Sequence, residues 1–337
     1  MRYGFLIVLA LLWVYTVNAQ DRATETRLYI TGNGSTKLPD SVYAYKKLEV
    51  LELTDFKLSK VPKDLKVERL VINRNGPKRR LKLSKNSTIK YLVFRGDETN
   101  KLPRRYNKLK KLESLQLSRC NVKKFPNVKG CDALKVLDLN NNSIEVIRPT
   151  FEKLKNLNHL SLYKNEVKVM PDFLFNVKSL HIIDFNYNHL REIPAAIAKL
   201  ENLEVIYISE NELTSLPDEI GELINLKELY IHHNLLTSLP LSIQKLTSLY
   251  TLRFNHNNVN AWPDGVTQLK GLSNLDCSFN KMTTLPLSEL DFPNVKLLSF
   301  AGNPWDPKVK ADLEVWADKY RKNGAIVHVD VQKLPGK

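Results

Sequence analysis

Residues 203–223 read Leu203-Glu-Val-Ile206-Tyr-Ile208-Ser-Glu-Asn211-Glu-Leu213, followed by Leu216-Pro217, Ile220 and Leu223. The next 23 residues carry the same residue types at the same offsets, from Leu226 to Leu246. Apolar residues that alternate with period two predict a short strand whose apolar side chains face a core. Self-similarity at a fixed period of this length predicts an array of stacked units.

This repeat extends over most of the 337-residue chain. Thirteen units can be placed, with spacings of 23, 19, 22, 23 and 22 residues and then 23 residues seven times. Their first residues are Glu25, Leu48, Val67, Ile89, Leu112, Leu134, Leu157, Leu180, Leu203, Leu226, Leu249, Leu272 and Val295. One such unit cannot bury its own apolar face, so we expect stability to come from stacking of neighbours.

Two further columns run through the units. Asn stands nine residues into most of them, at Asn33, Asn75, Asn142, Asn165, Asn188, Asn211, Asn234, Asn257, Asn280 and Asn303, while Phe56, Asp97 and Cys120 replace it in the other three. An apolar residue followed by Pro forms the second column, for example Leu216-Pro217 and Leu239-Pro240. Proline fixes φ and removes an N–H, so this side of each unit is predicted to be extended turn or short 3₁₀ helix.

The L-x-x-L-x-L-x-x-N-x-L pattern resembles the leucine-rich-repeat family over about residues 25–303. The resemblance implies an α/β fold: a right-handed horseshoe solenoid with a parallel β-sheet on its concave face and turns or 3₁₀ helices on its convex face. It also implies that the column Asn turns inward and bonds backbone groups. The L-P-x-x-I form resembles the Ras-suppressor-like class, which includes exported bacterial members.

The two ends of the chain depart from the repeat. Arg2, a thirteen-residue apolar run from Phe5 to Val17 and the small residue Ala19 are typical of a cleavable signal peptide over residues 1–19. Thirteen residues are fewer than the roughly 20 that a membrane span needs. We expect an exported protein, in the cell envelope, periplasm or medium, with no membrane span after signal removal.

The solenoid is predicted to cover residues 20–303, and residues 304–337 are predicted to form a cap. Val309, Leu313, Trp316 and Tyr320 recur at helical spacing, which predicts a helix that covers the last repeat. A final strand is expected over residues 325–331. Three Cys cannot form a disulfide scaffold, and all three fall at positions where we expect buried thiols.

The formal charge of +15 is concentrated in the early units. Residues 20–130 hold 28 Lys and Arg against 11 Asp and Glu, whereas residues 131–337 hold 22 against 25. A basic region suits an acidic partner, and for an exported protein an acidic glycan or other polyanion is a better candidate than nucleic acid. The basic residues of this half expected on the concave face are Arg69, Arg74, Arg95 and Arg119.

Residues that alternate with the core leucines should point out of the concave face. In the later units they include many aromatic and histidine side chains, which are typical of recognition surfaces. The predicted ligand-binding residues are Tyr163, Tyr187, Tyr207, Tyr230, His232, His233, Arg253, His256 and Phe279. A second interpretation stays open, because β-propensity and solubility alone favour aromatic and polar residues at such positions.

Little in the sequence indicates chemistry. His232, His233 and His256 fall in adjacent units, but no H-x-x-x-H or C-x-x-C spacing supports a metal site. A nucleophile–base set can be drawn from Ser209, His232 and Asp184, as it can on any polar face. No phosphate-binding glycine loop is present. The sequence therefore predicts a non-enzymatic protein, without metal or cofactor, that binds a protein or peptide on its concave face, with polyanion binding by residues 20–130 as the alternative.

Overall fold

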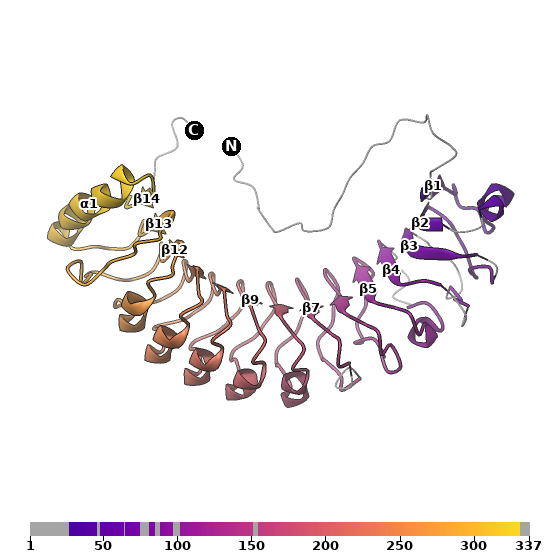
Figure 1. The fold of residues 1–337 in the computed structure, drawn as a ribbon, viewed down its shortest axis with the longest axis horizontal. Coiled ribbons are helices and arrows are strands. Elements are labelled where there is room, and N and C mark those ends of the chain that lie inside the picture. The colour runs from indigo at the N-terminus through magenta and orange to yellow at the C-terminus, as the bar shows by residue number, and fades with distance from the viewer. Residues whose placement is uncertain are drawn as a thin grey trace.

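The computed structural model describes residues 27–45, 48–63, 65–74, 81–84, 88–96, 102–150 and 154–330. These residues form one open arc with strands along its inner edge and short helices along its outer edge (Figure 1). The predicted signal peptide, Asn75 and Asp97 lie outside the described residues. The horseshoe solenoid that the repeat predicts is confirmed.

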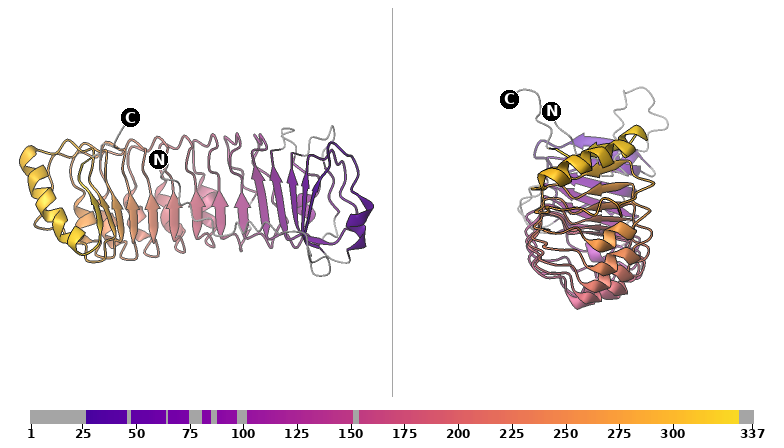
Figure 2. Two further views of the ribbon diagram at one scale, coloured as in Figure 1. Left: turned by 90° about the horizontal axis from the view of Figure 1, so that it is seen from above. Right: turned by 90° about the vertical axis from the view of Figure 1, so that its left-hand side faces the viewer.

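Within the described residues, fourteen parallel strands make a single sheet in chain order, each pairing with the next (Figure 2). The strands are β1 (Arg27–Thr31), β2 (Leu48–Thr54), β3 (Val67–Asn73), β4 (Tyr91–Arg95), β5 (Ser114–Ser118), β6 (Val136–Asp138), β7 (His159–Ser161), β8 (Ile182–Asp184), β9 (Val205–Tyr207), β10 (Glu228–Tyr230), β11 (Thr251–Arg253), β12 (Asn274–Asp276), β13 (Leu297–Ser299) and β14 (Ile326–His328). The register never slips, so equivalent residues of successive units form straight rows across the sheet.

The repeated apolar positions form the core between the sheet and the convex side. Leu203, Ile206, Ile208 and their equivalents in neighbouring units are fully buried. Each such side chain contributes roughly 1.5–3 kcal/mol by leaving water, and each contacts its counterparts in the units before and after. The strand pattern in the sequence therefore fixes which face of the sheet is left for other roles.

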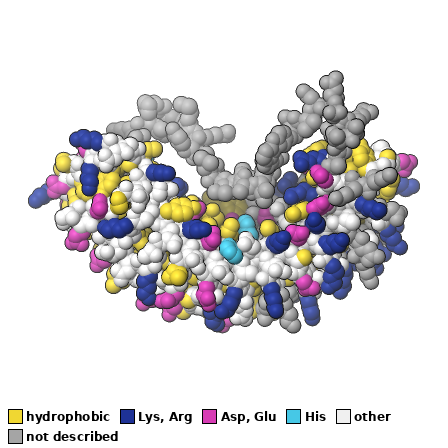
Figure 3. All heavy atoms as spheres, in the orientation of Figure 1, with side chains coloured by type: hydrophobic (Ala, Val, Ile, Leu, Met, Phe, Trp, Pro, Cys, Tyr) yellow, Lys and Arg dark blue, Asp and Glu magenta, His cyan; other side chains and the backbone are white. Residues whose placement is uncertain are grey.

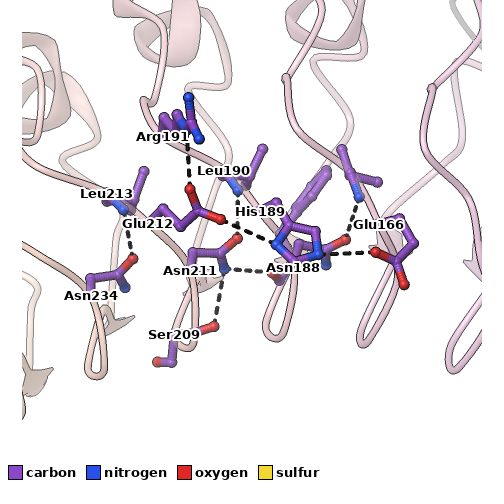
Figure 4. Close-up of polar contacts among 12 residues, drawn as sticks. Glu166, Asn188, His189, Leu190, Arg191, Ser209, Asn211, Glu212, Leu213 and Asn234 are labelled. Atoms are coloured by element: carbon purple, nitrogen blue, oxygen red, sulfur yellow. Dashed lines mark hydrogen bonds and ion pairs between the residues drawn. The ribbon is translucent and has the colours of Figure 1, made fainter.

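The Asn column is a buried ladder that satisfies backbone groups between units (Figure 4). Asn211 donates from Nδ2 to the carbonyls of Phe185 and Ile208, at 2.9 and 3.3 Å. Its Oδ1 accepts the backbone N–H of Leu190 at 2.9 Å. The same bonds recur one unit on, where Asn234 Oδ1 accepts the N–H of Leu213 at 3.0 Å. A buried amide costs little when all its groups are paired in this way.

The first units depart from the ladder. Asn33 is exposed and has a φ of 45°, so the prediction that it turns inward is wrong. The next column position, Phe56, is buried, and its ring lies so close to Gly32 that a Cβ there would be 2.5 Å from it. Cys120 donates from Sγ to the carbonyl of Ser118 at 3.3 Å and so takes the place of the amide. An apolar plug thus replaces the polar ladder near β1.

Proline starts the convex turns, as predicted. The Pro residues that precede them have extended ψ angles near 150° and end the incoming segment. The 3₁₀ helices are η1 (Asp40–Ala44), η2 (Tyr106–Lys108), η3 (Asp172–Asn176), η4 (Ala195–Lys199), η5 (Asp218–Glu222), η6 (Leu241–Lys245) and η7 (Asp264–Gln268). A 3₁₀ turn is shorter than a strand-to-strand α-helix would be, which keeps each unit narrow.

The helix α1 (Pro307–Lys322) and β14 cover the last repeat. Leu313 and Tyr320 of α1 are buried, and the Trp316 ring lies edge-on to those of Phe292 and Phe300. The Tyr320 hydroxyl accepts the backbone N–H of Phe292 at 3.1 Å. The helical cap expected from the apolar spacing is confirmed.

Cys120, Cys131 and Cys277 are buried free thiols, as expected. Burial raises the pKa of Cys131 to about 11, so it stays protonated at neutral pH. Within the part of the chain that the structure describes, no helix is both long and apolar enough to cross a membrane.

Candidate functional site

Three rows of side chains cross the concave face, and the middle row carries the first aromatic group. Tyr207 of β9, Tyr230 of β10 and Arg253 of β11 are paired in register. The two tyrosine rings stack at 4.8 Å between centroids, and the Arg253 guanidinium lies 5.7 Å from the Tyr230 ring. We call these three residues the strand stack. Because they stand on paired strands, their positions are held by the sheet.

A carboxylate fixes the strand stack from one side. Glu228 accepts hydrogen bonds from the Tyr230 and Tyr250 hydroxyls, at 2.6 and 2.5 Å. Burial raises the pKa of Tyr207 to about 12, and the hydrogen bond to Glu228 is the main cause that raises the pKa of Tyr250 to about 12. Tyr250 was missed by the sequence analysis, because it stands one residue before the alternating positions. Its place next to Glu228 depends on the neighbouring unit.

The second aromatic group lies just beyond the strands, at the edge of the concave face. We call Tyr187, Glu210, His233, His256 and Phe279 the rim row. Each has a φ between 52 and 56°, in the left-handed region. Each also donates its N–H to a carbonyl of the next unit, for example His233 to Asn255 and His256 to Ser278, at 3.0 Å in both cases. The repeat therefore demands a left-handed residue at this point, whichever side chain it carries.

The rings of the rim row stack on one another. His233 and His256 lie 4.1 Å apart with 10° between their planes, and His256 and Phe279 lie 4.4 Å apart with 8°. Phe279 in turn lies over Gly302, where a Cβ would be 2.5 Å from its ring. Tyr187 meets Tyr163 edge-on at 5.2 Å. Of the predicted ligand-binding residues, the structure thus gathers six at or beside the rim and three in the strand stack.

His232 connects the two groups. Its ring lies edge-on to both Tyr230 and His233, and its Nδ1 is 2.7 Å from Ser209 Oγ. Burial, together with the charges of His233, Arg253 and His256, lowers the pKa of His232 to about 4. The ring is therefore neutral at pH 7. Of the possible nucleophile–base set Ser209, His232 and Asp184, the first two are therefore within hydrogen-bonding distance.

The third member does not join them. Asp184 is paired instead with the Ser161 hydroxyl and the Asn186 N–H, at 3.1 and 3.0 Å. Nδ1 of His232 is occupied by Ser209, so no carboxylate orients the imidazole from that side. A base of pKa about 4 is poorly suited to activate a hydroxyl at neutral pH.

The arrangement of histidines does not suit a metal either. In the described part of the chain, no group of three or more His, Cys, Asp and Glu side chains could hold an ion. Figure 4 shows one histidine that does lie between two carboxylates, His189 between Glu166 and Glu212. Both ring nitrogens of His189 face a carboxylate, at 3.0 and 3.2 Å, which leaves neither nitrogen free for coordination.

The predicted basic patch lies toward the β1 end of the arc, and Figure 3 shows many Lys and Arg side chains on the side of the molecule at that end. Arg69 lies 4.5 Å from the centre of the Tyr91 ring. Arg74 forms an ion pair with Asp55 at 2.8 Å. Arg95 and Arg119 are exposed in adjacent units. The four residues lie in neighbouring units, on or just after β3, β4 and β5, and two of them already have partners.

Comparisons with known proteins agree with this fold. A family model described as "Leucine-rich repeat region" matches residues 114–235, and one described as "Leucine Rich Repeat" matches residues 225–246. No curated protein matches the chain significantly.

Solved structures extend the likeness over the whole arc. An internalin from Listeria monocytogenes is 17% identical with a TM-score of 0.68, over 93% of this chain and 88% of the internalin. A leucine-rich-repeat protein from Leptospira interrogans is 22% identical with a TM-score of 0.51, over 90% and 96%. The ectodomain of a plant receptor kinase from Arabidopsis thaliana, solved in complex with CASPARIAN STRIP INTEGRITY FACTOR 2, is 24% identical with a TM-score of 0.55, over 82% of this chain and 38% of the receptor. The family models thus match the leucine-rich-repeat pattern over residues 114–246, and the solved structures show that the arc as a whole has the fold of leucine-rich-repeat proteins.

Proposed function

We propose that the chain is an exported, non-enzymatic binding protein that holds a protein or peptide ligand on its concave face. The strand stack, the rim row, Tyr163 and His232 are its contact residues. The export signal over residues 1–19 and the L-P-x-x-I repeat class, with its exported bacterial members, support the exported location. The plant receptor ectodomain to which the chain is similar was solved in complex with CASPARIAN STRIP INTEGRITY FACTOR 2, and this complex supports a binding role for an array of this shape.

The observation that carries the proposal is the choice of residues in the rim row. A left-handed backbone costs little for Gly or Asn and about 1–3 kcal/mol for other residues. Three equivalent positions in other units hold residues of low cost, Gly96, Asn141 and Gly302, and the remaining ones hold Asp55, Arg74, Arg119 and Lys164. The rim row instead places Tyr, His and Phe there in neighbouring units. The ring contacts of these residues only offset the cost of their left-handed backbone, which Asn would avoid, so a binding role explains the run of aromatic rings best.

The test is simultaneous replacement of Tyr207, Tyr230 and His232 by Ala. We expect the affinity for a partner isolated with the parent chain to fall at least about 30-fold, since central aromatic residues dominate such interfaces. Replacement of Tyr43 and Tyr45, which are exposed on and beside η1, is the matched control and should leave binding unchanged. Unchanged binding in the triple variant would show that the site is elsewhere. Amino-terminal sequencing of the exported protein should begin at Gln20.

A second candidate is binding of an acidic glycan or other polyanion by residues 20–130. The exposed Arg95 and Arg119 in adjacent units favour it. Phosphate or sulfate contacts weaken steeply with ionic strength, whereas contacts of an aromatic patch change little. Binding to a sulfated polysaccharide that persists in the Tyr207, Tyr230 and His232 variant and disappears at high salt would support this candidate.

A further inference from the structure

The concave face changes its charge along the arc. Between β2 and β5 its outward residues include Arg69 and Arg95 against Glu52. Between β6 and β12 the residues in the same rows include one cation, Arg253, and four carboxylates, Asp138, Asp184, Glu228 and Asp276. The aromatic half of the face is therefore acidic, although the chain as a whole is strongly basic.

None of these four carboxylates forms an ion pair within the described residues, and two of them lie on the strands that flank β7. Asp138 on β6 and Asp184 on β8 stand in the middle row on either side of Ser161. Each accepts the backbone N–H two residues on, at 3.1 and 3.0 Å, and Asp184 also accepts the Ser161 hydroxyl. Neither forms an ion pair with any described residue. Burial raises the pKa of both to about 6, and Arg95 lowers it for Asp138 only in part.

An apolar strip runs beside the two carboxylates. The neighbouring row of the same strands holds Val136, Ile182 and Val205, all half-buried. His159 lies within this row, and burial lowers its pKa, so it adds no charge at neutral pH. Tyr163 and the strand stack lie on the other sides of the carboxylates. An occupant here meets apolar surface and carboxylate oxygens within a few ångströms.

This combination suits a long cationic side chain. Arginine and lysine cover apolar surface with their methylene stems and keep the charged head at the edge, and arginine also stacks on aromatic rings. A single metal ion does not suit it, since Asp138 and Asp184 stand two strands apart, about 10 Å by the spacing of strands. The charge of an incoming guanidinium or ammonium would compensate carboxylates that now have no counter-ion.

We propose that the concave face from β6 to β12 is the docking surface for an extended polypeptide segment with arginine or lysine side chains, at least one of which lies against Asp138 and Asp184. The inference rests on the proposed function and names the chemical class of its ligand. An extended segment of 12 residues reaches about 40 Å, enough to cross this part of the face.

The test uses a random 12-residue peptide library displayed on phage and selected on the purified chain at pH 7.5. We expect enriched peptides to carry Arg or Lys. A synthetic peptide of an enriched sequence should bind at least 10-fold more weakly when citrulline replaces its arginines, because citrulline keeps the shape and loses the charge. The double variant Asp138→Asn, Asp184→Asn should lose the same 10-fold for the arginine peptide and leave the affinity of the citrulline peptide unchanged.

The matched control is Asp132→Asn, Asp172→Asn, which removes the same charge from exposed positions off the concave strands and should change the affinity less than 2-fold. Enriched peptides without basic residues, or equal binding of the arginine and citrulline peptides, overturn the inference and leave peptide binding intact. If no peptide is enriched, or if enriched peptides bind the Tyr207, Tyr230 and His232 variant as tightly as the parent, the proposed function fails as well. The unchanged citrulline affinity separates a lost contact from a lost fold.

Discussion

The units of β1 to β5 and those of β6 to β13 satisfy the backbone hydrogen bonds between neighbouring units in two different ways. The early strands have five to seven residues and pair along their full length. The later strands have three residues, and the buried Asn ladder satisfies the backbone beyond them. Where the amide is missing, as at Phe56, an apolar plug and longer pairing replace it. A regular ladder thus frees the residues after the strand for a repeated turn, and the rim row stands on that turn.

The largest expected change in stability comes from placing an Asn of the ladder type in one of the early units. Phe56→Asn should lower the free energy of unfolding by about 4 kcal/mol, because the ring fills the space beside Gly32 and an amide there would lack the later units' partners. Urea unfolding measures it. Leu58→Ala, a cavity in the same unit, is the reference, and a Phe56→Asn variant as stable as the parent would mean that the two halves are interchangeable.

Removing one Asn of the ladder from the later units should lower the free energy of unfolding slightly less than Phe56→Asn does. Asn211→Ala loses one accepted and three donated hydrogen bonds and leaves buried backbone groups unpaired, so we expect a loss of about 3 kcal/mol. Asn225→Ala is the control, because that side chain is exposed and makes one bond, to the Glu201 carbonyl. Similar losses in the two variants would contradict a structural role for the ladder.

A gain in stability is expected at the acidic part of the face. The pKa of Asp138 and Asp184 is about 6 when folded and 3.8 in the reference state, so the folded chain binds more protons between these pH values and loses stability as pH rises through them. Asn has no such proton. The variant with both residues changed to Asn should therefore be more stable than the parent at pH 7, on the order of 1 kcal/mol after solvent screening.

That difference should become small by pH 4, where the carboxyls of the parent are protonated in the folded state and close to half protonated in the unfolded state. His232, whose lowered pKa acts in the opposite direction, is present in both proteins and cancels from the comparison. Unfolding curves at pH 4, 5, 6 and 7 give the difference directly. A constant difference over this range would show that the two carboxyls titrate normally.

The smallest effect on stability is expected in the rim row. Tyr187→Asn relieves a left-handed Tyr and loses the edge-on contact with Tyr163, two contributions of about 1 kcal/mol that oppose each other. We therefore expect a change within about 1 kcal/mol of zero, together with weaker ligand binding. Tyr207→Asn, on a strand, should cost about 2 kcal/mol because it loses a stacked, half-buried ring. Equal losses would remove the distinction between the rim row and the strand stack.

Features that repeat every unit could be predicted from the sequence. The core leucines, the Asn ladder and the convex turns after Pro each depend on residues close in the chain and on identical neighbours. The cap helix was equally predictable, since the spacing from Val309 to Tyr320 is a local pattern. The prediction that Asn33 turns inward failed because its unit stands at the end of the array, where the buried Asn ladder does not continue.

The sequence predicted which residues belong to the candidate site, but it did not predict how they are arranged. The alternating pattern gave Tyr207 and Tyr230 their place on the sheet, but treated Tyr187 and Phe279 as strand residues. These strands end after three residues. A left-handed turn follows, and because it accepts many residue types, the sequence does not reveal it. Asp138 and Tyr250 were missed because their surroundings come from strands one and two units away.

The left-handed turn has a consequence for how such an array can change over time. Its backbone is set by the hydrogen bonds to the next unit and accepts Gly, Asn, Lys, Glu, Tyr, His and Phe with nearly the same φ. One residue per unit can therefore be exchanged without a change in its neighbours' backbone. Substitutions along this row can therefore alter ligand preference one unit at a time while the backbone of the array stays the same, although neighbouring side chains of the row contact each other.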